Sequence, residues 1–294
     1  MVELLVWLVL VVIALWVFTR FYLQGEDLSR FDRSIESSMR SGEPSPQHYG
    51  SIEAISGLLK AGDGNKDRKT ELAHSRTAMD EMGDNADLTG VRLLEVNADG
   101  VPAEWVIAEG AHPDRRILYI HGGAFMMGSP RSHREITTAL SRIASASVLA
   151  IDYRLTPEHS RIACIEDCQT AYKWLLENGP EGRVGAPDVF YIAGDSAGGN
   201  LTLTTIAWAR DVGLRAVNAA LALSPLTDST FGSPSMRSNV LTDHMLGPSV
   251  GPITKVPKII LPWMGLMMSR VKPSDPIVSP VYGDLADLPP TLVQ

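Results

Sequence analysis

One serine lies in a sequence context that is typical of a hydrolytic nucleophile. Ser196 is at the centre of G-D-S-A-G-G-N at 194–200, after a β-branched and aromatic run at 189–192 and before an apolar-periodic stretch from Leu201. This pattern predicts a sharp turn from a strand into a helix, which raises the serine hydroxyl above the sheet. The flanking glycines let other backbone segments approach closely. We expect Ser196 to be the nucleophile of a hydrolase; for this motif alone, the alternative is a Gly/Ser-rich turn without chemistry.

A second motif could supply the groups that stabilise negative charge during acyl transfer. The segment H-G-G-A-F-M-M-G at 121–128 follows an apolar stretch at 116–120 that predicts a buried strand. Paired glycines after a strand expose backbone N–H groups without side-chain obstruction, as an oxyanion hole requires. We therefore expect Gly122 and Gly123, together with the N–H of Ala197, to donate to the oxyanion. A Gly-Gly turn that only joins strand to helix is the alternative.

The order of these and further motifs resembles the hormone-sensitive-lipase-like branch of the α/β hydrolases. The resemblance covers about residues 91–294, in the order of the family. The third glycine of the commonest oxyanion motif is Ala124 here, which keeps the backbone N–H but narrows the allowed conformations. The further matching segments are D-Y-R-L-T-P-E-H at 152–159, S-P-L-T-D at 224–228, D-P-I-V-S-P at 275–280 and L-P-P-T-L at 288–292.

The resemblance implies an α/β-hydrolase fold, with a mostly parallel central sheet, helices on both faces and a helical cap. It also implies a carboxylesterase or lipase-like enzyme that cleaves short- to medium-chain acyl esters through an acyl-enzyme on Ser196. It implies a small ester as the substrate. It implies no metal and no organic cofactor. The segment at 152–159 is expected to brace the loop at 121–128, here called the oxyanion loop, without taking part in the chemistry.

The residues after Ser196 do not complete a catalytic triad in a familiar way. In this fold the acid and then the histidine follow the serine, on loops after later strands. His244, next to Asp243, is the one histidine after the serine, in a region expected to belong to the cap. The resemblance places both missing residues later than the last residue of the sequence. His133 and His159 precede the serine, so we expect them to be structural or loop residues.

Three interpretations remain open. The first, which we favour, is a C-terminally truncated fragment whose parent continues for roughly 60 residues of strand and helix, so that the chain as given is inactive. The second is a complete enzyme that recruits His244 with Asp243 or Asp228. The third is a catalytically dead, membrane-tethered protein that binds an acyl ligand, since a serine without its base is a weak nucleophile. An open reading frame beyond Gln294 that encodes an acid and then a histidine would favour the first.

Composition and charge narrow the function classes. The 294 residues are 45% hydrophobic and 20% charged, which suits one catalytic domain with a sizeable core. The net charge of −8, without a basic stripe, argues against a nucleic-acid partner. Cys164 and Cys168 lie four residues apart on a predicted helix at 162–177. No further ligands lie nearby in the sequence, so we expect small core residues rather than a metal site or a disulfide framework.

The N-terminus predicts a membrane-spanning segment. An apolar run at 4–18 extends to Leu23 and is long enough, with snorkelling, to cross a bilayer. Glu3 at the start and bulky aromatic residues at the end are unlike a cleaved signal peptide, so an uncleaved single-pass anchor over 1–23 is expected. The basic residues after the span favour a cytoplasmic catalytic domain. They are Arg20, Arg30 and Arg33.

Between the anchor and the core, residues 24–87 predict a stalk and helices that cover the active site, with a polar break at 62–69. The core over 88–294 is expected to alternate strands and helices after an initial hairpin, as a mostly parallel sheet requires. The predicted strands are at 91–96, 102–108, 117–120, 147–152, 189–193 and 219–223.

Residues 230–272 interrupt this alternation and predict a cap inserted over Ser196. Its apolar run at 259–268 is too short to span a membrane and is expected to line an acyl or alcohol pocket. Packing on the core or contact with the bilayer surface is the alternative.

Overall fold

The computed structural model describes residues 2–31, 43–60 and 67–294, and these form two compact units. Unit 1 takes its residues from Met1–Asp67, Asp228–Met268 and Lys272–Ser274. Unit 2 takes its residues from Arg68–Thr227, Ser269–Val271 and Asp275–Gln294.

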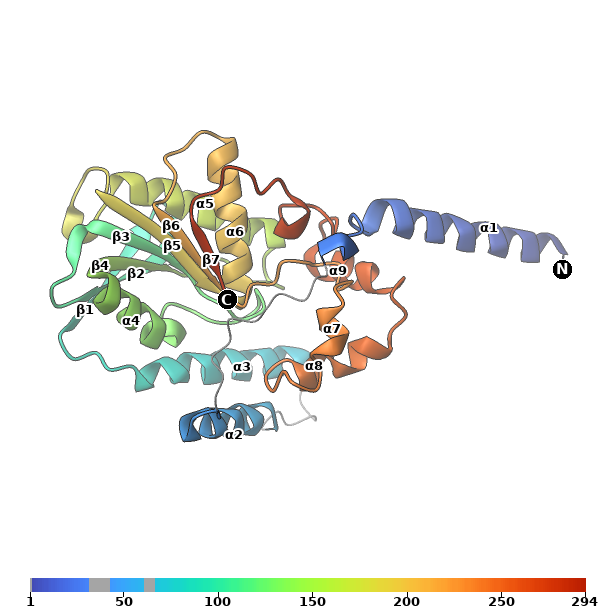
Figure 1. Ribbon diagram of the computed structural model, residues 1–294, viewed down its shortest axis with the longest axis horizontal. Helices are drawn as coiled ribbons and strands as arrows, with labels where there is room; N and C mark the ends of the chain where they lie inside the picture. Colours follow the sequence, from blue (N-terminus) through green and yellow to red (C-terminus); the bar gives the residue numbers. More distant parts are fainter. Residues whose placement is uncertain (1, 32–42, 61–66) are drawn as a thin grey trace. The chain divides into compact units, whose positions relative to one another are not determined.

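A twisted seven-stranded sheet, in the order β1-β2-β4-β3-β5-β6-β7, forms the centre of unit 2 as described (Figure 1). β2 is antiparallel to both β1 and β4, and all other neighbours are parallel. Parallel neighbours need crossover connections, which place helices on the faces of the sheet. The predicted fold class and the hairpin at one edge are therefore confirmed. The strands are β1 (Val91–Ala98), β2 (Val101–Ala108), β3 (His112–Ile120), β4 (Ala146–Ile151), β5 (Val189–Asp195), β6 (Ala219–Leu223) and β7 (Thr291–Val293).

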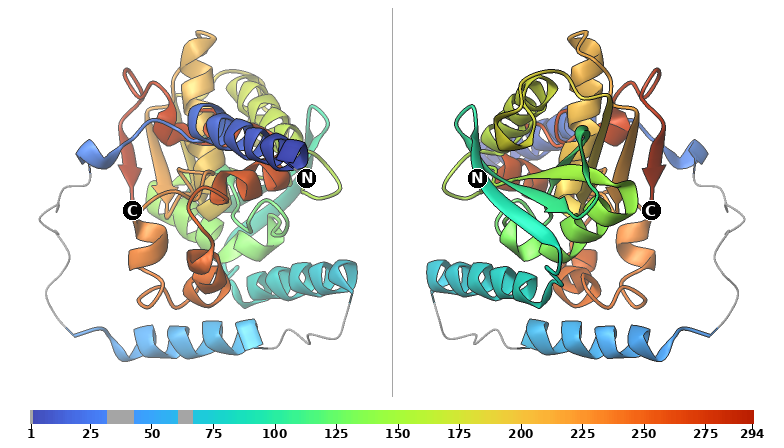
Figure 2. Two further views of the ribbon diagram at one scale, coloured as in Figure 1. Left: turned by 90° about the vertical axis from the view of Figure 1, so that its right-hand side faces the viewer. Right: turned by 90° about the vertical axis from the view of Figure 1, so that its left-hand side faces the viewer.

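Helices cover both faces of this sheet. α5 (Arg161–Glu177) and α6 (Ser196–Asp211) lie on one face and α4 (Arg134–Ala144) on the other (Figure 1). Figure 2 shows the twist of the sheet, with the β1-β2 hairpin and β7 at opposite edges. Every residue of β4 is buried, and each buried Val, Leu or Ile side chain contributes about 1.5–3 kcal/mol. The continuous apolar runs of the central strands thus reflect burial on both sides.

β3 begins earlier than its apolar run predicts. It contains Arg116, whose side chain is 1% exposed. The guanidinium donates to the carbonyl oxygens of Leu175 at 3.0 Å and Gly185 at 2.8 Å. Because these carbonyls replace water around the charge, a buried arginine is compatible with a strand.

α5 carries both cysteines into the core. The helix begins after Ser160, whose Oγ accepts a hydrogen bond from the N–H of Ala163 at 3.1 Å. Cys164 and Cys168 are buried free thiols, and burial raises the pKa of each. The prediction that they pack as small core residues is confirmed.

Unit 1 contains the apolar N-terminal helix. α1 (Val2–Phe18) continues through a π-helical turn at Thr19–Leu23. Val2–Leu23 is the one helix in the described residues that is long and apolar enough to cross a membrane, a property that anchors share with signal sequences. Arg33, which entered the prediction of membrane orientation, lies outside the described residues. The other helices of unit 1 are α2 (Pro46–Lys60), α7 (Ser235–Ser238), α8 (Gly247–Val250) and α9 (Leu261–Ser269), of which α9 ends at the boundary with unit 2.

The segment expected to form a stalk contributes to both units. α2 belongs to unit 1, whereas α3 (Arg68–Met82) belongs to unit 2 with the sheet. Residues 32–42 of this segment lie outside the described residues, as do residues 61–66 with most of the predicted polar break.

Candidate active site

Ser196 occupies the turn between β5 and α6. It is the first residue of α6, is half-buried and has a φ of 51°. Left-handed backbone is unfavourable for a residue with a side chain, and such strain clusters at functional sites. The strand-to-helix turn predicted for the motif is therefore present, with the serine at its tip.

The glycines around the serine are required by close backbone contacts. A Cβ atom on Gly198 would lie 1.9 Å from the carbonyl oxygen of Ile120, at the end of β3. A Cβ atom on Gly194 would lie 2.5 Å from the carbonyl oxygen of Gly198. Both distances are impossible for real atoms, so only glycine lets the start of α6 pass this close to β3. This contact brings the serine turn next to the loop that follows β3.

That loop adopts a left-handed path. The φ angles are 113° at Gly123, 55° at Ala124 and 62° at Phe125. The N–H groups of Met126 and Met127 both donate to the carbonyl oxygen of Gly123 at 3.0 Å and close the turn. Ala124 thus takes a left-handed conformation in place of the family's usual glycine, at a cost of about 1–2 kcal/mol. Among the described backbone hydrogen bonds outside helices and strands, none is donated by the N–H of Gly123 or Ala197.

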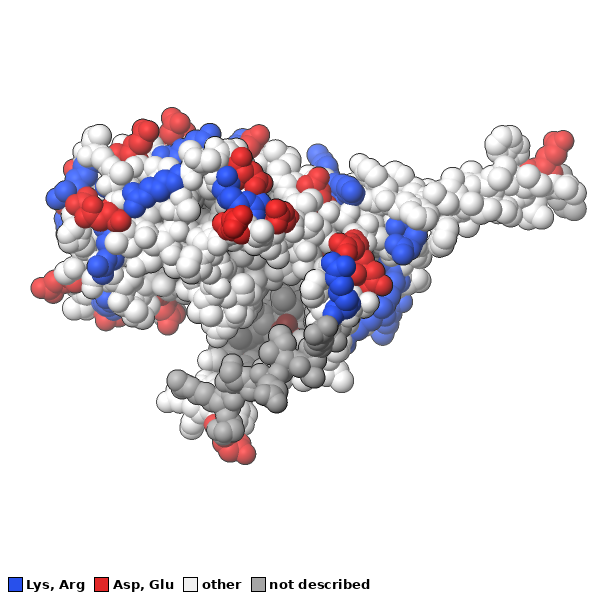
Figure 3. Space-filling view, turned by 45° about the horizontal axis from the view of Figure 1, so that its top comes forward, with Lys and Arg blue, Asp and Glu red and all other residues white. Residues whose placement is uncertain are grey.

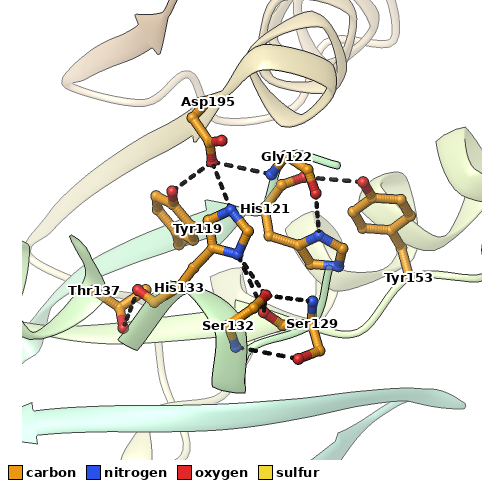
Figure 4. Close-up of polar contacts among 9 residues, drawn as sticks. All are labelled: Tyr119, His121, Gly122, Ser129, Ser132, His133, Thr137, Tyr153 and Asp195. Carbon is orange, nitrogen blue, oxygen red and sulfur yellow. Dashed lines mark hydrogen bonds and ion pairs between the residues drawn. The ribbon is translucent and has the colours of Figure 1, made fainter. Parts of the chain in front are cut away.

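The third predicted donor, Gly122, is already engaged. Its N–H donates to Asp195 Oδ1 at 3.0 Å, and the same oxygen accepts from the Tyr119 hydroxyl at 2.6 Å (Figure 4). His133 Nε2 lies 3.4 Å away. Burial raises the pKa of Asp195, but the interactions with His133, Tyr119 and Gly122 outweigh it and hold the pKa below its usual value. The Gly122 amide would be available to an oxyanion only after its bond to Asp195 opens.

His133 lies beside Asp195, the residue directly before Ser196. Its side chain is buried, and Nδ1 lies 2.8 Å from Ser132 Oγ and 3.4 Å from the carbonyl oxygen of Ser129 (Figure 4). His159 is exposed. His133 therefore links Ser129 and Ser132 to the carboxylate of Asp195. The one sequence signal for this contact with His133 is Asp195, the acidic residue of the G-D-S motif.

His121 is buried in an environment that disfavours a charged imidazole. Nδ1 lies 2.7 Å from the carbonyl oxygen of Gly122, and the ring stacks on Tyr153 at 4.3 Å between centroids. Nε2 is buried and has no partner among the described residues. Burial, helped by the nearby His133, lowers the pKa of His121 to about 3. The imidazole is therefore neutral in the folded protein.

This pKa predicts a loss of stability in acid. The unfolded chain binds a proton at His121 below about pH 6.5, whereas the folded protein excludes it until about pH 3. The contribution of His121 to the free energy of unfolding should therefore fall by about 1.4 kcal/mol for each unit by which the pH is lowered across that window. Above the window this contribution should be constant. Denaturant unfolding at pH 7, 5 and 4 should show a flatter pH dependence for His121→Asn than for wild type. Parallel curves would contradict a neutral buried His121.

The segment at 152–159 braces the oxyanion loop, as expected. The Tyr153 hydroxyl donates to the carbonyl oxygen of His121 at 2.9 Å. Thr156 donates to the carbonyl oxygen of Phe125 through its N–H at 2.8 Å and its hydroxyl at 3.0 Å. The guanidinium of the buried Arg161 lies 3.4 Å from the centre of the Phe125 ring and also bonds to Asn200.

Asn200, the last residue of the serine motif, connects it to two later motifs. Its side-chain amide donates to the carbonyl oxygens of Leu226 at 2.5 Å and Val278 at 2.9 Å. These acceptors lie in the S-P-L-T-D and D-P-I-V-S-P segments. The distant motifs of the sequence therefore meet through one buried side chain.

Arg76 of α3 also holds the oxyanion loop, a contact that the sequence did not predict. Its guanidinium donates to the carbonyl oxygens of Met126 at 2.7 Å and Thr156 at 3.1 Å, and pairs with Glu158 at 2.8 Å. α3 thus fixes both the loop and its brace.

Loss of the Arg76 hydrogen bonds should lower kcat more than it weakens substrate binding. Arg76→Gln removes donors from two carbonyls, and a loop displaced by a fraction of an ångström should lower kcat by about ten-fold. Steady-state kinetics on a soluble ester would measure this effect. Arg92→Gln, which removes a surface ion pair with Glu181, is the matched control. An equal effect of both variants would contradict a specific role for Arg76.

His244, the one histidine after Ser196 in the sequence, belongs to unit 1, whereas Ser196 belongs to unit 2. His244 is exposed in unit 1. Asp243 Oδ1 accepts from the N–H groups of Met245 and Leu246 at 3.0 and 2.7 Å, so it caps its own turn. Asp228 accepts from the N–H and hydroxyl of Thr230 at 2.8 and 2.6 Å. These hydrogen bonds hold each acid within its own turn, and the triad that uses His244 stays a prediction.

Known proteins are similar to this chain in sequence and in fold. The acetyl-hydrolase of Streptomyces hygroscopicus is 34% identical over 77% of this chain and 71% of its own length. The carboxylesterase/phospholipase LipF of Mycobacterium tuberculosis is 41% identical over 51% of this chain, which is 37% of LipF. The crystal structure of an esterase from the bacterial hormone-sensitive lipase family is 31% identical and superposes with a TM-score of 0.69 over 86% of this chain and 79% of that chain.

Residues 117–294 match the family model described as the alpha/beta hydrolase fold. The match includes the oxyanion loop, the serine turn and the segments joined by Asn200. The chain therefore belongs to the α/β hydrolase family and resembles the esterases of its hormone-sensitive-lipase branch.

Proposed function

We propose that this protein is a serine hydrolase that cleaves carboxylic esters through an acyl-enzyme. The observation that carries the proposal is the left-handed Ser196 at the start of α6, held by Gly198 against the end of β3. Here the hydroxyl and the N–H of Ala197 lie at the N-terminus of a helix, where unpaired amides favour negative charge. The names of the similar proteins, which include acetyl-hydrolase, carboxylesterase and esterase, support this function.

In the proposed reaction, Ser196 Oγ attacks the ester carbonyl and a histidine takes its proton. The carbonyl oxygen becomes an oxyanion that accepts hydrogen bonds from Gly123 and Ala197, joined by Gly122 if its bond to Asp195 opens. The alcohol leaves with the proton, and water then releases the acid from the serine. The histidine and its acid are not among the described partners of Ser196. The activity assays use the protein as its gene encodes it.

A fluorophosphonate probe and p-nitrophenyl butyrate would test the proposal together. We expect ester turnover by the full gene product, and peptide mass spectrometry should find the probe on Ser196. Turnover with the probe on another residue would contradict the assignment. Saturable binding of the ester without turnover or labelling would favour the acyl-ligand-binding pseudoenzyme instead.

We further propose that α1 is a membrane anchor and that residues 230–272 form a cap that binds the acyl chain. The length and apolar surface of Val2–Leu23 support the anchor. The cap is supported by the break in strand and helix alternation after β6 and by the apolar α9. Carbonate extraction of membranes would test the anchor, since an anchored protein stays in the pellet.

A further inference from the structure

The end of α1 is packed into unit 1 rather than left free. Thr19 and Leu23 are 1% and 0% exposed, in contrast to α1 itself, in which no residue is buried. The Trp263 indole N–H donates to Thr19 Oγ1 at 2.7 Å, and the Trp263 ring lies 5.6 Å from that of Phe18. The apolar helix and α9 are therefore joined by a specific hydrogen bond and an aromatic contact.

Residues after α9 hold the same end of α1. Ser274 Oγ donates to the carbonyl oxygen of Tyr22 at 3.4 Å, and Lys272 Nζ lies 5.2 Å from the centre of the Tyr22 ring. A segment that is removed by a signal peptidase would not be expected to supply core contacts of the mature protein. These contacts indicate that Val2–Leu23 is retained.

α9 carries apolar side chains on its exposed side. Leu261, Gly265 and Ser269 are buried, one turn apart. Met267 and Met268 are 71% and 60% exposed on the same helix. A helix that is apolar all round is normally buried or in contact with lipid. Methionine suits a deformable apolar environment of this kind.

The groups around this junction are those of a membrane interface. Tyr22 and Trp263 lie where the apolar span ends, as aromatic residues do at bilayer interfaces, and Lys272 is beside them. α1 carries no Lys or Arg, and its one acidic residue, Glu3, is in its first turn. Figure 3 shows acidic atoms at the tip of this helix and none along the rest of it. This pattern is typical of a boundary between lipid and water at the contact of α1 with α9.

We propose that α9 is a second membrane contact, with Met267 and Met268 in the lipid interface beside a retained α1. The partner is the bilayer itself. The proposal rests on the anchor proposed above and does not depend on esterase activity. It makes the predicted cap a lipid-facing element, so that an apolar ester could reach the protein from the membrane.

Fluorescence at position 267 would test the lipid contact. Met267→Cys in the full chain, labelled with an NBD dye and placed in phosphatidylcholine and phosphatidylglycerol vesicles, should show blue-shifted emission. Lipids with nitroxide groups near the headgroup should quench it. Cys164 and Cys168 are buried and should not react. Val184→Cys, at an 87% exposed site in unit 2, is the control and should show neither effect.

Three results would overturn the proposal. The first is emission at position 267 that resembles the aqueous control. The second is a blue shift without quenching by lipid nitroxides, which would identify a protein partner instead. The third is a mature protein from host membranes whose mass lacks the first 23 residues. No turnover is measured, so a failure here would leave the esterase proposal standing.

Discussion

Replacing Ser196 with alanine is expected to lower ester turnover by about 10⁴- to 10⁶-fold, because it removes the atom that forms the acyl-enzyme. The amides of Gly123 and Ala197 would remain and could still polarise a bound ester. Substrate affinity should therefore change much less than kcat. The measurement is p-nitrophenyl butyrate hydrolysis by the full gene product, with circular dichroism to confirm folding.

Ser224 provides a matched control for this substitution. It follows β6 as Ser196 follows β5, and its φ of 44° is also left-handed. Ser224→Ala should keep wild-type turnover, since the residue is exposed and precedes no helix. If Ser196→Ala were as active as Ser224→Ala, the serine turn would have no chemical role.

Replacing Gly198 with alanine is expected to damage both the fold and the site. The new methyl group would lie 1.9 Å from the carbonyl oxygen of Ile120 and 2.6 Å from that of His121, and neither backbone atom can rotate away. The start of α6 must shift by an ångström or more, which should cost about 1–3 kcal/mol of stability. Because Ser196 and the Ala197 amide move with it, kcat/KM should fall by about 100-fold.

Gly50→Ala adds the same methyl group to a helix where nothing lies within 4 Å. It should leave activity unchanged and stabilise α2 by up to about 1 kcal/mol. Thermal unfolding and steady-state kinetics on both variants would separate a steric effect from a general effect of losing glycine. Wild-type behaviour of Gly198→Ala would mean that α6 does not approach β3 as described.

Local sequence patterns predicted the parts of the site that depend on backbone. The run at 189–192 followed by glycines predicted β5 and the turn at Ser196, because buried strands and left-handed turns restrict residue type strongly. The paired glycines likewise predicted the loop after β3. The start of β3 at His112 was missed because residues 112–115 are His, Pro, Asp and Arg and contain no apolar run.

Side-chain contacts between distant segments were not predictable in the same way. Arg76 reaches the oxyanion loop from α3, and His133 reaches Asp195 across 62 positions of sequence. Each is a polar residue whose type fits many surface positions equally well. Only the three-dimensional path of the chain shows which ones are buried. The contact between Thr19 and Trp263 belongs to the same class.

The two thiols of α5 offer a gauge of how often the core opens. Neither Cys164 nor Cys168 reaches solvent in the closed fold, and burial suppresses their ionisation. A thiol reagent can therefore react only while α5 is detached from the sheet. The rate of this reaction in buffer without denaturant would report how often α5 detaches from the sheet. The rate of this thiol reaction could also be followed in native vesicles without attaching any dye to the protein.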